Sequence, residues 1–254
     1  MTSDQYVSSI ISKYKVKDEI DALTQLFVIY PLEKIIRNWA STWLDEIKIS
    51  GSRAKGTAIN LSSDLDLFIS LKSSNPFTLK QIYNSLYDAI IKEGISARKQ
   101  NVSIGINYQG HNIDLVPASR HSGNTNYHSL YKSKADSWTQ TNIDKHINLV
   151  KDSGRRDEII ALKIWRKLHG LDFPSIYLEL TVLEALYYKN KNQLGFNFLT
   201  ILEYLQNEFV EKRIVDPSNT NNVISDDLYK YEKQAIAAKA MESRSAKAWE
   251  EIIW

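Results

Sequence analysis

The 254-residue chain has 43% hydrophobic content, enough to bury a sizeable core in one large domain or two small lobes. Its 32 Lys and Arg nearly balance 30 Asp and Glu, so the net charge of +2 gives no strong bulk field for a polyanion. The absence of cysteine excludes disulfides, thiolate zinc sites and a cysteine nucleophile. No apolar run approaches the ~20 residues of a membrane span, and residues 1–5 do not resemble a secretory signal. We therefore expect a soluble, cytoplasmic protein with no membrane partner.

The predicted elements change character along the chain. Residues 5–47 are expected to be helical, and strands are expected in residues 47–117, interrupted by a helix within residues 77–94. The polar segment 118–141 predicts an irregular connection. Further helices are expected at 143–150, 155–168, 175–189, 194–210 and 226–253. The helical prediction near the N-terminus rests on an apolar stripe at helix spacing: Leu23, Leu26, Phe27, Tyr30, Leu32, Ile35 and Ile36.

These patterns predict an α/β fold with two lobes in one compact unit. Residues 1–140 would form a lobe of strands and helices, braced by the N-terminal helix. Residues 141–254 would form an all-helical lobe. The expected boundary lies where the polar connection gives way to continuous helical periodicity.

Two aspartates in an apolar run carry the first chemical signal. Asp64 and Asp66 are two residues apart, and alternate residues of a strand face the same side. Leu65, Leu67 and Ile69 would then face a core. Two carboxylates on one face repel unless a cation lies between them, and Mg²⁺ combines a few carboxylates with waters and substrate phosphates. Such a pair also occurs on solvated sheet edges, so a third carboxylate would strengthen the metal hypothesis.

Asp114 supplies that third carboxylate within another apolar run. The run before it, residues 102–108, is joined to it by Gln109-Gly110, which predicts a hairpin turn. Asp114 could therefore lie beside the strand of Asp64 and Asp66. Three carboxylates on adjacent strands can hold two metal ions, one at an attacking hydroxyl and one at the leaving phosphates. The structural alternative is a buried Asp bonded to backbone amides.

A Gly-Ser turn precedes the first two aspartates. Gly51 permits close approach of the backbone to a phosphate, because it has no Cβ. Ser52 can donate from both its hydroxyl and its amide. Turn and acids together predict a triphosphate cradle beside a metal site.

These residues resemble the signature of the DNA polymerase β-like nucleotidyltransferase superfamily. Within it, the chain resembles the branch of 2′-5′ oligoadenylate synthases, cGAS/DncV-like (CD-NTase) cyclic-oligonucleotide synthases and archaeal CCA-adding enzymes. The resemblance runs from about residue 49 to residue 224. It includes a lysine helix at 161–165, a Ser-x-x-Leu-Glu-Leu helix at 175–180, and a late segment with Asp216-Pro217 and Asn222-Val223.

The resemblance implies a fold and a set of site residues. Residues 1–140 would be a polymerase β-like catalytic lobe, with a mixed twisted sheet and helices. The helical lobe would complete the fold, with the active site in the cleft between the two lobes. Asp64, Asp66 and Asp114 would be catalytic and bind two Mg²⁺ ions, with Mn²⁺ as an alternative cofactor. Gly51, Ser52, Lys163 and Ser175 would bind the nucleotide triphosphate.

Two further nucleotide-binding candidates also follow from the resemblance. His146 occupies a place where CCA-adding enzymes carry a phosphate-contacting histidine, although a lone histidine is more often a surface or packed residue. The branch stacks an aromatic residue directly after the phosphate serine, whereas this sequence has Ile176 there and Tyr177 one position later. Tyr177 is therefore a candidate for base stacking or for the core. Lys163 and Ser175 have structural alternatives as well, a snorkelling lysine and an N-cap serine.

The expected activity is metal-dependent nucleotidyl transfer with release of pyrophosphate. The first hypothesis is synthesis of a linear or cyclic oligonucleotide second messenger in antiviral signalling, from NTP substrates that include ATP. The second is template-independent addition to an RNA 3′ end, which keeps an RNA acceptor open as a partner. The third is a non-catalytic nucleotide-binding regulator. An activating ligand or protein is also left open.

Overall fold

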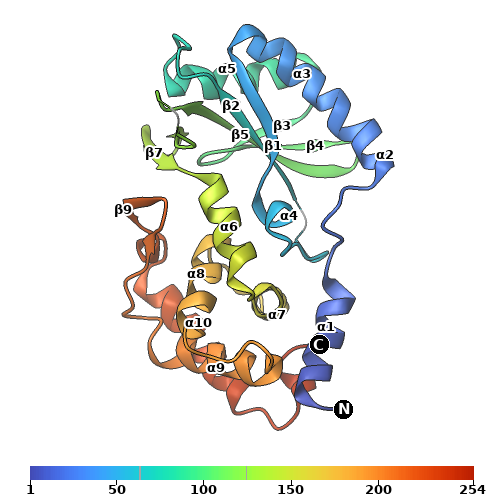
Figure 1. Cartoon of the computed structure of the whole chain (residues 1–254), viewed down its shortest axis with the longest axis vertical. Coiled ribbons are helices and arrows are strands. Elements are labelled where there is room, and N and C mark those ends of the chain that lie inside the picture. The colour runs from blue at the N-terminus through green and yellow to red at the C-terminus, as the bar shows by residue number, and fades with distance from the viewer. Residues whose placement is uncertain (63, 124) are drawn as a thin grey trace. The chain divides into compact units, whose positions relative to one another are not determined.

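The computed structural model describes residues 1–62, 64–123 and 125–254, which form two compact units (Figure 1). The helical unit consists of Met1–Val16, Gly56–Ser62 and Asn148–Trp254. The sheet unit consists of Lys17–Lys55 and Ser63–Ile147. This division differs from the expected lobes of residues 1–140 and 141–254, because the N-terminal helix and the segment 56–62 pack with the helical unit.

The sheet unit is built on a mixed sheet. Its path runs β1-β2-β5-β4-β3, while β6 pairs with β5 and β7 pairs with β6. Strands β2 and β5 are parallel, and the other pairs are antiparallel. The strands are β1 (Leu44–Ile49), β2 (Leu65–Leu71), β3 (Ala97–Lys99), β4 (Ile104–Tyr108), β5 (His111–Arg120), β6 (His128–Lys132) and β7 (Ser137–Thr141).

The hairpin between β4 and β5 confirms the predicted turn. Gln109 and Gly110 both have positive φ, 51° and 78°, as a tight hairpin of this kind requires. The prediction for residues 118–141 was wrong: β5 continues to Arg120, and β6 and β7 form a second hairpin. Polar composition concealed these strands, because their backbone pairing and the burial of His128, Leu130 and Tyr131 depend on the neighbouring sheet.

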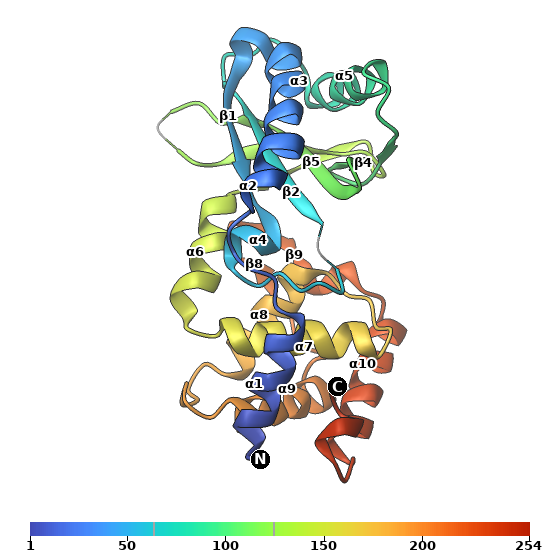
Figure 2. The same cartoon turned by 90° about the vertical axis from the view of Figure 1, so that its right-hand side faces the viewer.

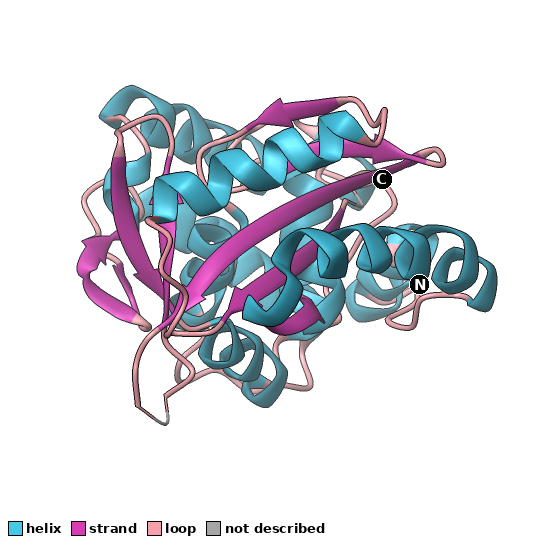
Figure 3. Cartoon of the chain, turned by 90° about the horizontal axis from the view of Figure 1, so that it is seen from above, coloured by secondary structure: helices cyan, strands magenta, loops and turns pink. Residues whose placement is uncertain are grey.

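One face of the sheet is covered by α3 (Tyr30–Ala40) and α5 (Leu79–Lys92), as Figures 1 and 3 show. These helices pack against each other and share one apolar cluster with alternate residues of the two parallel strands. The opposite face of the same strands carries Asp66 and Asp114. The residues that face the helices include Leu65, Leu67 and Ile69 of β2, as predicted, with Ile113 and Leu115 of β5.

The apolar stripe that predicted a helix near the N-terminus is divided between a buried face and an exposed face. Leu32 and Ile36 are fully buried, but Leu23, Leu26, Phe27 and Tyr30 are 53–67% exposed. Two irregularities in the predicted helix explain this division. Residues 15–21 are not helical, and a π-helical segment, η1 (Gln25–Ile29), separates α2 (Ala22–Thr24) from α3 and shifts the facing of side chains.

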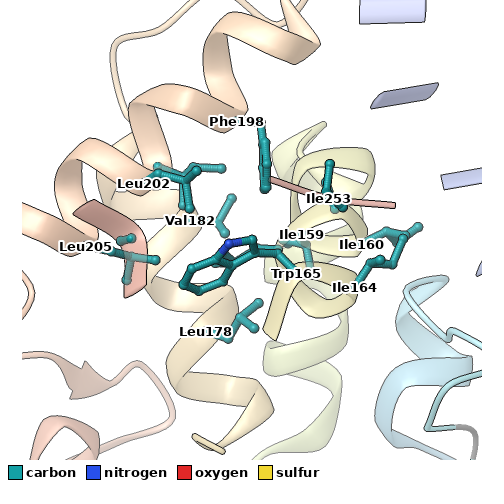
Figure 4. Packing of buried hydrophobic residues seen from close by; sticks show 14 of the residues in the cluster. Ile159, Ile160, Ile164, Trp165, Leu178, Val182, Phe198, Leu202, Leu205 and Ile253 are labelled. Carbon is teal, nitrogen blue, oxygen red and sulfur yellow. The ribbon is translucent and has the colours of Figure 1, made fainter. Parts of the chain in front are cut away.

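The helical unit encloses a second core around Trp165 (Figure 4). The indole ring lies among side chains of α7, α8, α9 and the C-terminal segment, and its Nε1 donates to Ser243 Oγ at 2.9 Å. The helix α1 packs on α7 and α9 (Figure 2), and its buried residues Val7, Ile10 and Ile11 belong to this core. The helices are α1 (Ser3–Tyr14), α7 (Arg156–Leu168), α8 (Ser175–Ala185), α9 (Leu194–Asn207) and α10 (Lys230–Arg244), and α6 (Ile143–Ser153) begins in the sheet unit and ends here.

This unit is not all-helical, contrary to the prediction. The Asp216-Pro217 segment forms a hairpin of β8 (Val215–Asp216) and β9 (Asn219–Val223). Asp216 Oδ1 accepts hydrogen bonds from the backbone amide and hydroxyl of Ser218, at 2.7 and 2.8 Å, which closes the turn. In the described residues of both units, no helix is long and apolar enough to cross a membrane.

The buried and exposed faces of residues 23–36 predict different responses when a side chain is shortened to alanine. Leu32→Ala should lower the free energy of unfolding by about 2–5 kcal/mol, because it leaves a cavity in the core. Leu26→Ala should change it by less than about 0.5 kcal/mol, because this side chain is exposed. Urea unfolding of both variants measures the difference. Equal losses of stability in the two variants would show that Leu26 is buried as well as Leu32.

Candidate active site

The turn between β1 and β2 places Gly51 against the carboxylate of Asp66. Gly51 has a φ of +58° and is the first residue of the short helix α4 (Gly51–Lys55). A Cβ built on it would lie 1.8 Å from Asp66 Oδ2. The preceding residue, Ser50, connects this turn to β2 through a hydrogen bond from its backbone amide to the Asp66 carbonyl at 2.8 Å. Only glycine therefore leaves space for the carboxylate here.

The parallel pairing of β2 and β5 brings two of the predicted acids together. Asp66 is the direct partner of Asp114 in the register. Paired residues on neighbouring strands are about 5 Å apart and face the same side of the sheet. Asp64 lies two residues before Asp66, just ahead of β2, and is exposed. The sequence-based prediction that Asp114 lies beside this strand is confirmed.

Asp114 lies in an environment that disfavours its charge. Burial is the main cause that raises the pKa of the Asp114 carboxyl, and the nearby negative charge of Asp64 raises it further. Gln100, Arg98 and Ser103 act in the opposite direction. Gln100 Nε2 donates to Asp114 Oδ1 at 3.0 Å. A cation near these carboxylates would relieve the repulsion that Asp64 contributes.

Sequence reasoning missed the residues that surround Asp114. Gln100 is held in place by Ser103, whose hydroxyl donates to Gln100 Oε1 at 2.7 Å. Gly105 is opposite Asp114 on β4, and a Cβ there would lie 2.5 Å from Gln100 Nε2 and 2.8 Å from Arg98 Nε. A glycine within an apolar strand is a signal of close approach by another group, and this one could have been found.

The donor set of this site fits a hard divalent cation. Three carboxylates are the ligand type that Mg²⁺ prefers, and Asp66 and Asp114 share one face of the sheet. Across the described ranges, however, no three Asp, Glu, His or Cys side chains are grouped closely enough to form a ready-made cage. Mg²⁺ usually completes its octahedron with waters and substrate phosphates, so an open set of carboxylates is consistent with binding together with a nucleotide.

Lys163 lies in the helical unit, where its ammonium forms hydrogen bonds with two neighbouring side chains. The side chain is buried, with 2% of the residue exposed, and Nζ donates to Thr57 Oγ1 and to Glu179 Oε1, both at 2.9 Å. The predicted alternative of a snorkelling lysine is therefore wrong. Its phosphate-binding role stays a prediction, which would require the ammonium to reach a nucleotide from this ion pair.

Ser175 and His146 are more accessible than Lys163. Ser175 is exposed and is the first residue of α8, whose N-cap is Pro174. It makes no side-chain cap, so the N-cap alternative is wrong. His146 is half-buried on α6, in the part of that helix that belongs to the sheet unit. Both phosphate-binding roles stay predictions.

Tyr177 is a core residue rather than a base-stacking residue. It is fully buried, and its ring stacks on Phe209 with centroids 4.8 Å apart. Phe173 packs edge-on against the same ring. Burial is also the main cause that raises the pKa of the Tyr177 hydroxyl above its usual range. A ring covered in this way cannot stack on a nucleotide base.

Residues 32–120 match the family of the nucleotidyltransferase domain. This segment contains the Gly51 turn and all three carboxylates. The predicted resemblance to nucleotidyltransferases is confirmed. The nucleotidyltransferase segment runs from Leu32 in α3 to Arg120 at the end of β5, so it includes the two parallel strands that carry Asp66 and Asp114.

A curated protein of Escherichia coli (strain MS 115-1), Cyclic AMP-AMP-AMP synthase, is 25% identical over 172 residues. The match covers 62% of this chain and 53% of that protein, so the chain spans about half the length of this relative. The aligned part is longer than the nucleotidyltransferase segment. Similarity to a protein of this kind therefore extends beyond the residues that match the domain family.

Solved structures share the fold over nearly the whole chain. CdnC of E. coli MS115-1 with ATP gives a TM-score of 0.79 at 18% identity, covering 98% of this chain and 96% of that one. CdnG, a CD-NTase of Bradyrhizobium diazoefficiens in complex with GTP, gives 0.75 at 10% identity, covering 96% and 92%. The Cid1 poly(U) polymerase gives 0.65 at 13% identity, covering 96% and 95%. The predicted α/β fold class is thus confirmed, apart from the β8–β9 hairpin in the helical unit.

Gly51→Ala should damage the candidate site by displacing the Asp66 carboxylate. Gly110→Ala is the matched control, because Gly110 also has positive φ but nothing lies within 4 Å of an added Cβ. Both variants should lose about 1 kcal/mol from the left-handed backbone. Only Gly51→Ala should also weaken binding of Mn²⁺, measured by electron paramagnetic resonance. Equal Mn²⁺ affinity in the two variants would contradict a role for this close approach.

The raised pKa of Asp114 predicts a pH-dependent stability. A carboxyl with a raised pKa in the folded state contributes stability below its unfolded pKa and loses it as the pH rises through the folded value. The stability of Asp114→Asn relative to the unmodified chain should therefore increase with pH. Urea unfolding without divalent metal, from about pH 4 to about pH 8, measures this difference.

Asp64 provides the internal control for this experiment. Because its charge helps to raise the pKa of Asp114, the effect of Asp114→Asn should be smaller when Asp64 is replaced by Asn. A stability difference that does not vary with pH in either background would mean that Asp114 titrates as an ordinary carboxyl.

Proposed function

We propose that this chain is a metal-dependent nucleotidyltransferase that joins NTPs into a linear or cyclic oligonucleotide and releases pyrophosphate. The observation that carries the proposal is the pairing of Asp66 with Asp114, with Asp64 close by and Gly51 against the Asp66 carboxylate. The relative called Cyclic AMP-AMP-AMP synthase and the ATP-bound and GTP-bound structures of the same fold support NTPs as substrates.

The carboxylates would hold Mg²⁺, which when bound supplies positive charge to the reacting phosphate and lowers the pKa of a coordinated hydroxyl. Asp114 is suited to receive the proton of the acceptor hydroxyl, because burial and Asp64 raise its pKa. The hydroxyl oxygen then bonds to the α-phosphorus as the bond to the β-phosphate oxygen breaks. We expect half-buried Ser52 and exposed Ser175 to donate hydrogen bonds to the triphosphate. Lys163 would also bind the triphosphate.

A second candidate function is template-independent extension of an RNA 3′ end. The structural similarity to the Cid1 poly(U) polymerase over 96% of this chain favours it, because that protein shares the fold. The nearly balanced charge of the chain gives it little electrostatic attraction for long RNA, and this favours the oligonucleotide synthase instead. The antiviral second-messenger role is proposed on the family resemblance alone, and the cytoplasmic location on the sequence-based expectation.

One assay distinguishes the candidates. The purified chain is incubated with Mg²⁺ or Mn²⁺ and the four labelled NTPs, with and without an RNA primer, and phosphatase-resistant products are identified by mass. We expect a linear or cyclic oligonucleotide without primer. Extension of the primer alone would instead support the second candidate.

The matched variant for this assay is Asp66→Asn, which removes one charge while keeping the size of the side chain. It should lower product formation by at least about a hundredfold, the lower end of the usual contribution of a group that holds the reacting charges. A solved structure of E. coli CdnC contains a HORMA protein in the complex. Candidate activating proteins should therefore be added to the assay if the chain alone forms no product. Absence of both product and metal-dependent NTP binding would contradict the enzyme proposal.

A further inference from the structure

A cavity of the sheet unit lies away from the carboxylates. Its volume is about 650 Å³, within the usual range of small-molecule sites. It is lined by Leu71 at the far end of β2, five residues beyond Asp66, which corresponds to about 17 Å along a strand. Trp39, at the end of α3, forms part of its wall, and we call the cavity the Trp39 pocket.

The walls of the Trp39 pocket are aromatic and fixed in place. Trp39 Nε1 donates to Ser85 Oγ at 3.1 Å, which sets the orientation of the indole. Trp43 and Phe77 meet edge to face, with centroids 6.4 Å apart and an interplanar angle of 88°. Phe77 nevertheless remains 48% exposed. A flat apolar ligand would cover this exposed surface and gain hydrophobic free energy from it.

The charges around the pocket favour a cation. The lining includes Lys80 and Asp88, both on α5. Lys80 is neutralised by Asp136, whose carboxylate lies 3.0 Å from the ammonium. Asp88 makes no hydrogen bond or ion pair with any residue that the structure describes. The lining therefore carries one uncompensated negative charge beside tryptophan rings, which themselves attract cations.

We propose that the Trp39 pocket is a binding site for an organic cation with a flat apolar body. The aromatic rings would hold the body of the ligand, and Asp88 would pair with its positive group. The site is independent of the proposed nucleotidyl transfer, because none of its lining residues is a candidate for metal or nucleotide binding.

Three probes of equal shape and different charge test the proposal on the full chain. Naphthylethylamine, naphthylethanol and naphthylpropionate are titrated separately and followed by ligand-observed NMR. The amine should bind at least about fivefold more tightly than the alcohol, which an ion pair and a cation–π contact of ordinary strength would together give. The propionate should bind most weakly. ATP should not displace the amine.

Two variants and a control locate the binding. Asp88→Asn should abolish the preference for the amine over the alcohol but keep the binding of the alcohol. Phe77→Ala should weaken both. Glu93→Gln is the control, because Glu93 is exposed near the end of the same helix but does not line the pocket, and it should change neither.

The proposal is overturned if none of the probes binds, or if the propionate binds as well as the amine. It is also overturned if ATP displaces the amine, which would place the amine in the nucleotide site. Binding of the amine that survives both Asp88→Asn and Phe77→Ala would equally exclude this pocket.

Discussion

The in-register pairing of β2 with β5 is the constraint on which the rest of the candidate site depends. It places Asp66 beside Asp114 while Leu65, Leu67 and Leu115 enter the core under α3 and α5. A slip of one residue would exchange these sets and bury the carboxylates among apolar side chains. The core therefore fixes the register, and the register brings two like charges together. Such an arrangement is unfavourable unless something nearby compensates for it.

Around Asp114 the compensation comes from nearby glycines, from the amide of Gln100 and from the positive charge of Arg98. Gly51 and Gly105 have no side chains, so Asp66 and Gln100 can occupy the adjacent space. Gln100 then donates to Asp114 without neutralising it. Asp66 and Asp114 thus share one face of the sheet with the charge of Asp64 nearby, and a divalent cation would be attracted to this arrangement.

The lysine of the helical unit illustrates a different solution. Its ammonium is buried with Glu179 and the hydroxyl of Thr57, so both charges of the ion pair are hydrogen-bonded within the unit. Removing one partner of such a pair leaves the other charge buried and unpaired, which is strongly destabilising. Lys163 consequently has a structural role that is independent of any phosphate, whereas exposed Ser175 has none that the structure shows.

The similarity of the fold to both CD-NTases and a poly(U) polymerase does not distinguish between the possible acceptors of the nucleotide, since one fold can support several of them.

The sequence by itself determined the local features of this protein. Alternation placed Asp66 on the strand face opposite Leu65 and Leu67, although the strand begins only after Asp64. The Gln109-Gly110 turn predicted the hairpin, and the combination of motifs predicted the nucleotidyltransferase resemblance. Each depends on residues close together in the chain or on a pattern of residue types. The tertiary structure alone decided what depends on distant partners. It buried Tyr177 against Phe209, exposed Leu26 and Phe27 through a π-helical turn, and made strands of a polar segment. Burial and pairing are properties of the surroundings, and the surroundings of a residue exist only once the chain has folded.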